Sequence, residues 1–76
     1  MCVAVPGQVV QIEENAGVRI GRVSFGDTTK QVMLALVPDV RVGDFVMVEA
    51  GLATVKVEKE QADEILKFIK ELDELT

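Results

Sequence analysis

The first residues of the chain offer its clearest chemistry, because the single cysteine among 76 residues is Cys2. It is followed closely by Pro6-Gly7, a pair that holds the preceding chain extended and then permits a sharp turn or a close backbone approach. Removal of Met1 by an aminopeptidase, which small second residues favour, would place a free amine beside the thiol. A nearby ammonium favours the thiolate, and a terminal thiolate is a soft ligand suited to low-valent iron or copper.

The rest of the composition limits what that thiol can do. A single cysteine forms no internal disulfide, and a chain without histidine builds neither a Ser–His–Asp or Cys–His catalytic unit nor a four-ligand zinc site from its own residues. Because one thiolate does not hold a catalytic metal alone, iron at Cys2 needs ligands from diatomic molecules or another protein. We therefore expect a carrier or assembly partner and not an enzyme. The structural alternative is that Cys2 belongs to a frayed terminus or is a small buried hydrophobe, and that Pro6-Gly7 starts the first strand.

The composition argues against two classes of partner, nucleic acids and membranes. The net charge is −5, the pI is about 4.5, and neither Trp nor Tyr is present. This composition opposes binding to a phosphate backbone and stacking on nucleic-acid bases. No apolar run reaches the ~18 residues of a membrane span, and residues 1–7 lack the positive charge and length of a signal peptide. We expect a cytoplasmic protein that binds neither nucleic acid nor membranes.

The elements that must position Cys2 follow from two periodicities. Valine-rich runs separated by glycine-containing turns predict strands over residues 8–13, 18–23, 30–36, 45–49 and 52–57. Five short strands at this spacing indicate a mainly β fold, a small five-stranded OB-like β-barrel. In the second strand, Val18 and Ile20 are expected to alternate with Arg19 and Arg22 on a solvent-exposed face.

After Val57 the glycines stop and apolar residues recur with helical spacing, which predicts an amphipathic helix over residues 59–75. The start of this helix has no Ser, Thr, Asp or Asn cap. Phe68 widens its apolar stripe and is a candidate docking anchor. The residues of the stripe expected to cover the barrel are Ala62, Ile65, Leu66, Ile69 and Leu72. The chain is thus expected to be one domain over 1–76, with the barrel at about 8–57 and the C-terminal amphipathic α-helix after it.

Several blocks of the sequence resemble a known family, the HypC/HybG/HupF family of [NiFe]-hydrogenase assembly chaperones. The similarity extends in order over nearly the whole chain and includes the acidic helical ending. The blocks that carry it are Met1-Cys2-Val3-Ala4-Val5-Pro6-Gly7, Leu34-Ala35-Leu36-Val37-Pro38-Asp39-Val40, Val42-Gly43-Asp44-Phe45-Val46-Met47-Val48 and Ala50-Gly51-Leu52-Ala53.

The resemblance implies an OB-like barrel with a C-terminal helix and a specific set of partners. Family members bind HypD, an iron–sulfur protein, and with it form the scaffold on which iron acquires cyanide and carbon monoxide as Fe(CN)2CO. They are thought to escort this group to the hydrogenase large-subunit precursor, and a HypE-type protein joins through the complex. The resemblance further implies that the iron is transient and shared with the partner, and that Cys2 contacts it. The partner-binding residues implied are Cys2, Val3, Ala4, Val5, Pro6, Gly7, Glu49 and Gly51.

The sequence departs from the family at Glu49, where a histidine is usual. Glutamate accepts hydrogen bonds and ligates hard ions, but it suits soft iron poorly, so a role for this position in holding iron is in doubt. Its structural alternative is a polar strand end beside a turn. Asp44 is expected to cap backbone donors in a turn, and Gly51 and Ala53 to permit tight packing. Two other functions remain open: an OB-fold nucleic-acid-binding module, and a thiol redox protein using Cys2.

Overall fold

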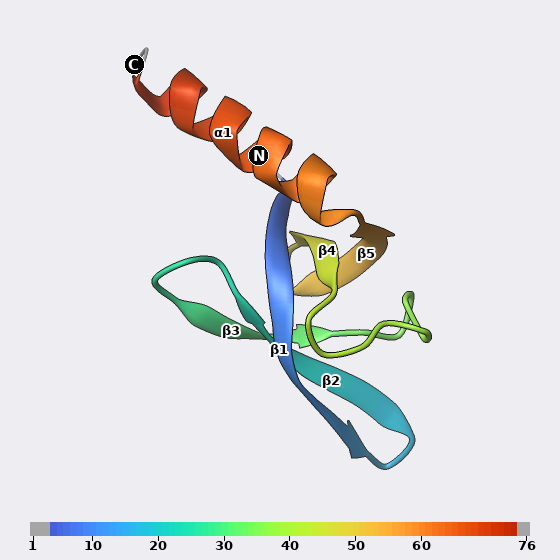
Figure 1. The fold of residues 1–76 in the computed structure, drawn as a ribbon. Helices are drawn as coiled ribbons and strands as arrows, with labels where there is room; N and C mark the ends of the chain where they lie inside the picture. Colours follow the sequence, from blue (N-terminus) through green and yellow to red (C-terminus); the bar gives the residue numbers. More distant parts are fainter. Residues whose placement is uncertain (1–3, 75–76) are drawn as a thin grey trace.

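A computed structural model describes residues 4–74, in which a closed five-stranded barrel is followed by one helix (Figure 1). The strand order around the barrel is β1-β2-β3-β5-β4. This confirms the predicted mainly β barrel with a C-terminal helix. Cys2, Val3 and Leu75 fall outside the described residues. The elements are β1 (Val5–Asn15), β2 (Val18–Ser24), β3 (Thr29–Met33), β4 (Phe45–Glu49), β5 (Leu52–Val57) and α1 (Lys59–Glu74).

The first strand begins earlier than predicted, at Val5 instead of residue 8. Pro6 and Gly7 lie within β1 and pair with β4, which agrees with the structural alternative for these two residues. The strand serves two neighbours in turn, because Gln8 pairs with Phe45 of β4 and also begins the pairing with β2. From Val5 onward the chain is therefore part of the barrel.

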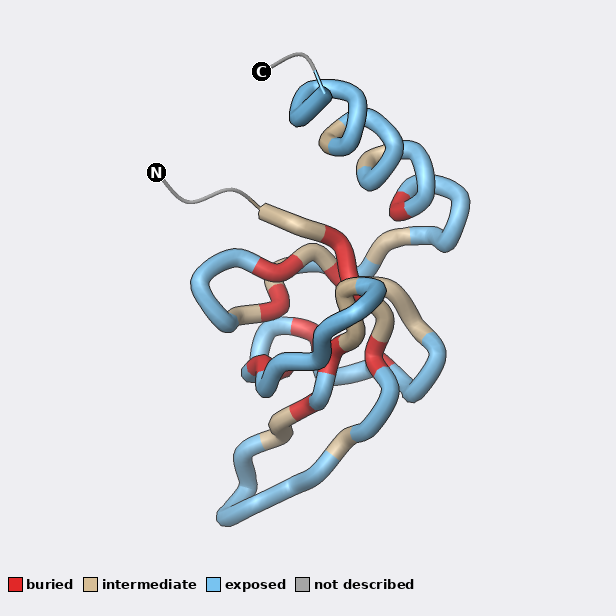
Figure 2. Tube along the Cα trace, turned by 90° about the vertical axis from the view of Figure 1, so that its left-hand side faces the viewer, coloured by how far each residue is buried: buried red, intermediate tan, exposed pale blue. Residues whose placement is uncertain are grey.

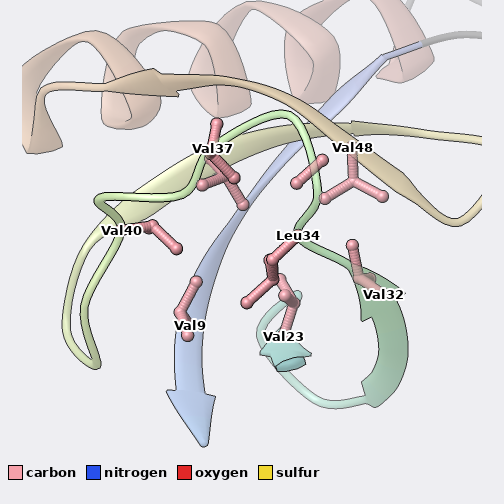
Figure 3. Packing of buried hydrophobic residues seen from close by; sticks show 9 residues of the cluster. Val9, Val23, Val32, Leu34, Val37, Val40 and Val48 are labelled. Atoms are coloured by element: carbon pink, nitrogen blue, oxygen red, sulfur yellow. The ribbon is translucent and has the colours of Figure 1, made fainter. Parts of the chain in front are cut away.

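The core is made largely of valine, and part of it comes from a connecting segment (Figure 3). The third strand was predicted to reach Leu36 but ends at Met33. Beyond it, the N–H of Val37 donates to Leu34 and the N–H of Val40 donates to Val37, each at 3.1 Å. These successive turns direct Leu34, Val37 and Val40 inward at intervals of three residues, which an extended strand does not do. The buried cluster comprises Val9, Val23, Val32, Leu34, Val37, Val40, Val46, Val48 and Ala53.

The predicted alternation in β2 is wrong at Val18 and Arg19, whereas Arg22 is exposed as expected. Val18 is exposed, whereas Arg19 is half-buried and lies on the same side of the strand as the fully buried Val23. The guanidinium of Arg19 donates to the carbonyl oxygen of Pro38 and, at 2.9 Å, to that of Val40. An inward arginine is stable here because its charged end reaches the backbone of the connecting segment while its stem stays apolar.

The helix begins at Lys59 as predicted, and its apolar stripe covers the barrel only in part, since Ile65 and Ile69 are half-buried. At its start the N–H of Glu58 donates to the side-chain oxygen of Gln61 at 3.2 Å, which is one half of a capping box. Ala62 is the buried residue of α1, and the helix then extends away from the barrel (Figure 2). The large apolar side chains left exposed are Leu66 (40%), Phe68 (60%) and Leu72 (48%). Within residues 4–74, no helix combines the length and apolar character needed to cross a membrane.

Candidate functional site

The start of β1 lies beside the end of β4, and this pairing brings together two parts of the predicted site that are distant in sequence. Val5 pairs with Val48, the residue directly before Glu49. Ala4 and Val5 are half-buried, and the next two residues are buried. Glu49 is exposed at the end of its strand. Cys2 precedes this pairing in the chain and lies outside the described residues. Its predicted contacts with iron and with a partner therefore stay predictions.

Gly7 allows β1 to approach the barrel closely. A Cβ at this position would lie 2.4 Å from Cγ1 of Val23 and 2.8 Å from Cε1 of Phe25. Neither atom belongs to the tip of a long, mobile side chain, so the strand would have to shift. Pro6, next to it, is also buried. Because both residues are enclosed, they fix the direction in which the preceding chain enters the barrel, while contact between these two residues and a partner stays a prediction.

The turn after Glu49 has a left-handed backbone at two successive positions. Glu49 pairs with Leu52, and the residues between them have positive φ, 52° at Ala50 and 79° at Gly51. This is the two-residue hairpin turn whose twist matches that of its strands. No heavy atom lies within 4 Å of a Cβ built on Gly51, so the expected tight packing there is wrong and the glycine serves the backbone conformation. Ala53 is fully buried, as expected.

Asp44 organises the turn that precedes β4. The N–H of Arg41 donates to Oδ2 of Asp44 at 2.9 Å, which confirms the predicted capping role, and Nζ of Lys56 lies 3.4 Å from the same oxygen. The backbone hydrogen bond from Arg41, followed by the nearby Lys56, lowers the pKa of Asp44 from its ordinary value of 3.8. The N–H of Val9 donates to the carbonyl of Asp44 at 2.8 Å, so this turn is tied to β1. Asp44 therefore has a structural role at the opposite end of β4 from Glu49.

A slot that the sequence did not indicate lies next to the predicted site, between β3 and the start of β1. Its volume is about 370 Å³. It shares Val5 and Gly51 with the predicted partner-binding residues. No signal in the sequence reveals it, because it results from where β3 and β5 separate. The residues that line this slot, called the β3 slot below, are Val5, Phe25, Thr28, Lys30, Gln31, Val32, Val48, Ala50 and Gly51.

The described residues offer no cluster of side chains suited to a metal ion. Between residues 4 and 74, no group of three or more His, Cys, Asp or Glu side chains is arranged to hold a metal ion. The metal contact predicted at Cys2 lies outside this range.

Comparison with known proteins identifies the family of the chain. A sequence model described as the HupF/HypC family matches residues 1–69. A protein of Synechocystis sp. named "Hydrogenase maturation factor HypC" is 45% identical over 74 residues, which cover 95% of this chain and 97% of that protein. A protein of the same name from Rhizobium leguminosarum bv. viciae is 38% identical over 71 residues, covering 93% and 91% of the two chains. Since each match extends over nearly the full length of both compared chains, the chain belongs to the HupF/HypC family.

Proposed function

We propose that this protein is a hydrogenase maturation chaperone that binds a HypD-type iron–sulfur protein and helps to assemble Fe(CN)2CO and deliver it to the large-subunit precursor of a [NiFe] hydrogenase. The match to the HupF/HypC family over residues 1–69, which includes Cys2, carries this proposal. The relatives named as hydrogenase maturation factors support it, because their similarity covers nearly the whole chain.

The role of Cys2 follows from ligand chemistry. Its thiolate is a soft donor suited to low-valent iron, and the chain has no second cysteine and no histidine. The remaining ligands are then cyanide, carbon monoxide and a donor from the partner. In this arrangement the iron group is cargo shared between two proteins and not a resident cofactor.

The barrel gives this thiol a fixed base. Val5 is the third residue after Cys2, and it is held in β1 by pairing with Val48. Pro6 and Gly7 are buried immediately after it. We therefore assign partner docking to this end of the barrel, where the described chain begins.

Glu49 lies at the same end of the barrel but is assigned a different task. Its carboxylate is exposed, and carboxylates prefer harder ions than low-valent iron. We assign Glu49 to the rim of the partner interface, where it can accept hydrogen bonds, and assign iron contact in this chain to Cys2.

The test is infrared spectroscopy of the protein purified anaerobically with its HypD-type partner. Wild type is expected to show the stretching bands of iron-bound cyanide and carbon monoxide. Cys2→Ala should lose them while keeping the circular dichroism of the folded barrel, because residue 2 precedes the first strand. Glu49→His, which restores the usual family residue, is the matched control and should retain the bands.

Each outcome bears on a separate part of the proposal. Bands that persist unchanged in Cys2→Ala would refute iron contact through this thiol. No bands in wild type, with iron supplied and the partner bound, would leave a docking adaptor without a role in carrying iron. Bands that appear with the partner and not without it would support a shared ligand set.

A further inference from the structure

Among residues 4–74, no strand pairs with one edge of β3 over most of its length. β2 pairs with β3 from Thr29 to Met33, whereas β5 meets it at a single position, where Met33 pairs with Leu52 in parallel. β5 then continues away from the earlier part of β3, and the turn at Ala50-Gly51 stands where a longer β5 would have run. The described chain therefore leaves residues 29–32 of β3 without a paired strand on this side, and we call this unpaired side the gap.

The backbone groups that face this gap can be identified from two hydrogen bonds. The N–H of Leu34 donates to Arg19 of β2, while the N–H of Met33 donates in the opposite direction, to Gly51, each at 3.0 Å. Backbone groups alternate in direction along a strand, so the N–H and C=O of Gln31 point away from β2 and toward the gap, as those of Met33 do. An unpaired strand edge of this kind is a template for another extended chain.

The β3 slot lies directly beside this edge and has an apolar floor. Val32 and Val48, 1% and 8% exposed, belong to the buried cluster and lie near each other in Figure 3. Val5, Phe25 and Ala50 add to the apolar part of the lining. A volume of about 370 Å³ accommodates a few side chains. The slot could thus receive the inward-facing side chains of a strand paired with β3.

Among the described residues that line the slot, Lys30 is the charged one. Lys30 is exposed and stands two residues from the buried Val32, so both side chains project from the same face of β3. A strand laid along the edge would place one side chain over the floor at Val32. The side chain two positions away in that strand would meet Lys30, and opposite charges at such cross-strand positions are stabilising.

We propose that the free edge of β3 and the β3 slot bind an extended segment of a partner protein by strand addition. The segment carries an apolar side chain that enters the slot, and an acidic side chain two residues away that pairs with Lys30. The hydrogen bonds come from the backbone of Gln31, and selectivity comes from the slot and the lysine.

A second copy of this chain fits the site less well than such a partner. The β3 strand of a second copy would present Lys30 and Val32 on the matching face and no acidic side chain. Symmetric pairing of two β3 edges would place each lysine against apolar surface without a counter-ion, which is costly. Charge complementarity therefore favours a different protein with an acidic and apolar alternating segment.

This inference goes beyond the proposed function, because strand addition requires neither iron nor Cys2. The slot does share Val5 and Gly51 with the end of the barrel where the HypD-type partner is expected. The test below contains no metal, so its failure would leave the infrared experiment on Cys2→Ala unaffected, and the reverse also holds.

The probe is a nine-residue synthetic peptide of alternating valine and threonine, with one glutamate two positions from the central valine. One control peptide has lysine instead of glutamate, and another has N-methyl groups on alternate amides, which block ladder hydrogen bonds. Binding and amide exchange are followed by NMR on the full chain. In the free protein the amide of Gln31 should exchange faster than those of Lys30 and Val32, and the glutamate peptide should slow its exchange. The lysine peptide should bind about fivefold more weakly.

Two substitutions separate edge pairing from other modes of binding. Gln31→Pro removes the N–H that faces the gap, a position at which edge strands tolerate proline, and should abolish peptide binding. Gln31→Ala keeps that N–H and should bind like wild type. Lys30→Glu should reverse the preference between the glutamate and lysine peptides.

Four results would overturn the proposal. The first is that the amide of Gln31 is already protected against hydrogen exchange in the free protein at low concentration. The second is that no peptide at millimolar concentration slows the exchange of this amide. The third is equal binding by folded Gln31→Pro and Gln31→Ala. The fourth is protection that grows with protein concentration in the absence of peptide, which would assign the edge to a second copy.

Discussion

Replacing Gly7 by alanine tests how the start of β1 is held against the barrel. The added Cβ would lie 2.4 Å from Cγ1 of Val23, whereas contacts of Cβ atoms under 3.0 Å essentially do not occur, so the two atoms must separate by at least 0.6 Å (3.0 − 2.4). The added Cβ would also lie 2.8 Å from Cε1 of Phe25, so the strand cannot relieve the first contact by moving toward this ring. Val23 is fully buried in a close-packed core, so its side chain cannot move away without displacing other residues.

Overpacking of this kind costs about 1–3 kcal/mol of unfolding free energy. For a domain of this size, a loss of that magnitude lowers Tm by roughly 5–20 °C. The measurement is urea and thermal unfolding of Gly7→Ala beside wild type, followed by circular dichroism.

A double-mutant cycle with Val23→Ala distinguishes the steric cause from a general effect of alanine in the strand. Removing the methyl groups of Val23 makes space for the new Cβ, so Gly7→Ala should cost about 0.5–3 kcal/mol less in the Val23→Ala background. An equal cost in both backgrounds, or a single-mutant loss below about 0.5 kcal/mol, which is the range of neutral surface changes, would refute the packing assigned to Gly7.

Two further predictions concern the turn before β4 and the exposed helix. Asp44→Asn should lower the urea midpoint slightly at pH 7, because the depressed pKa of Asp44 in the folded state adds stability above its unfolded-state pKa of about 3.9. That contribution disappears as the pH falls through the folded-state pKa, so the difference between variant and wild type should shrink below about pH 4; a difference that stays constant to lower pH would contradict the assignment. Phe68→Asp should change the unfolding free energy by less than about 0.5 kcal/mol, since the side chain is 60% exposed; a loss above about 2 kcal/mol in the same urea titration would mean that this ring packs against the barrel.

The features that could be predicted from the sequence are those set by neighbouring residues. The barrel strands and the start of the helix at Lys59 follow from the period of apolar residues, and the capping role of Asp44 follows from turn chemistry within four residues. The chemistry expected of Cys2 depends on residue type alone, and it stays a prediction. Each of these properties is encoded over a short stretch of chain, where propensity and hydrogen bonding act directly.

Tertiary pairing decided the features that the sequence left ambiguous or predicted wrongly. Arg19 lies inward because the connecting segment supplies carbonyl oxygens to its guanidinium, a contact that spans about twenty residues. Leu66 and Leu72 of the helical stripe remain exposed, although Ala62 is buried, because α1 leaves the barrel instead of folding over it. The periodicity of a stripe is the same whether or not anything covers it. The open edge at Gln31 exists because β5 begins where β3 ends, which is a matter of register between distant strands. Sequence periodicity determines which residues share a face, and long-range pairing then determines which faces are buried and which edges stay free.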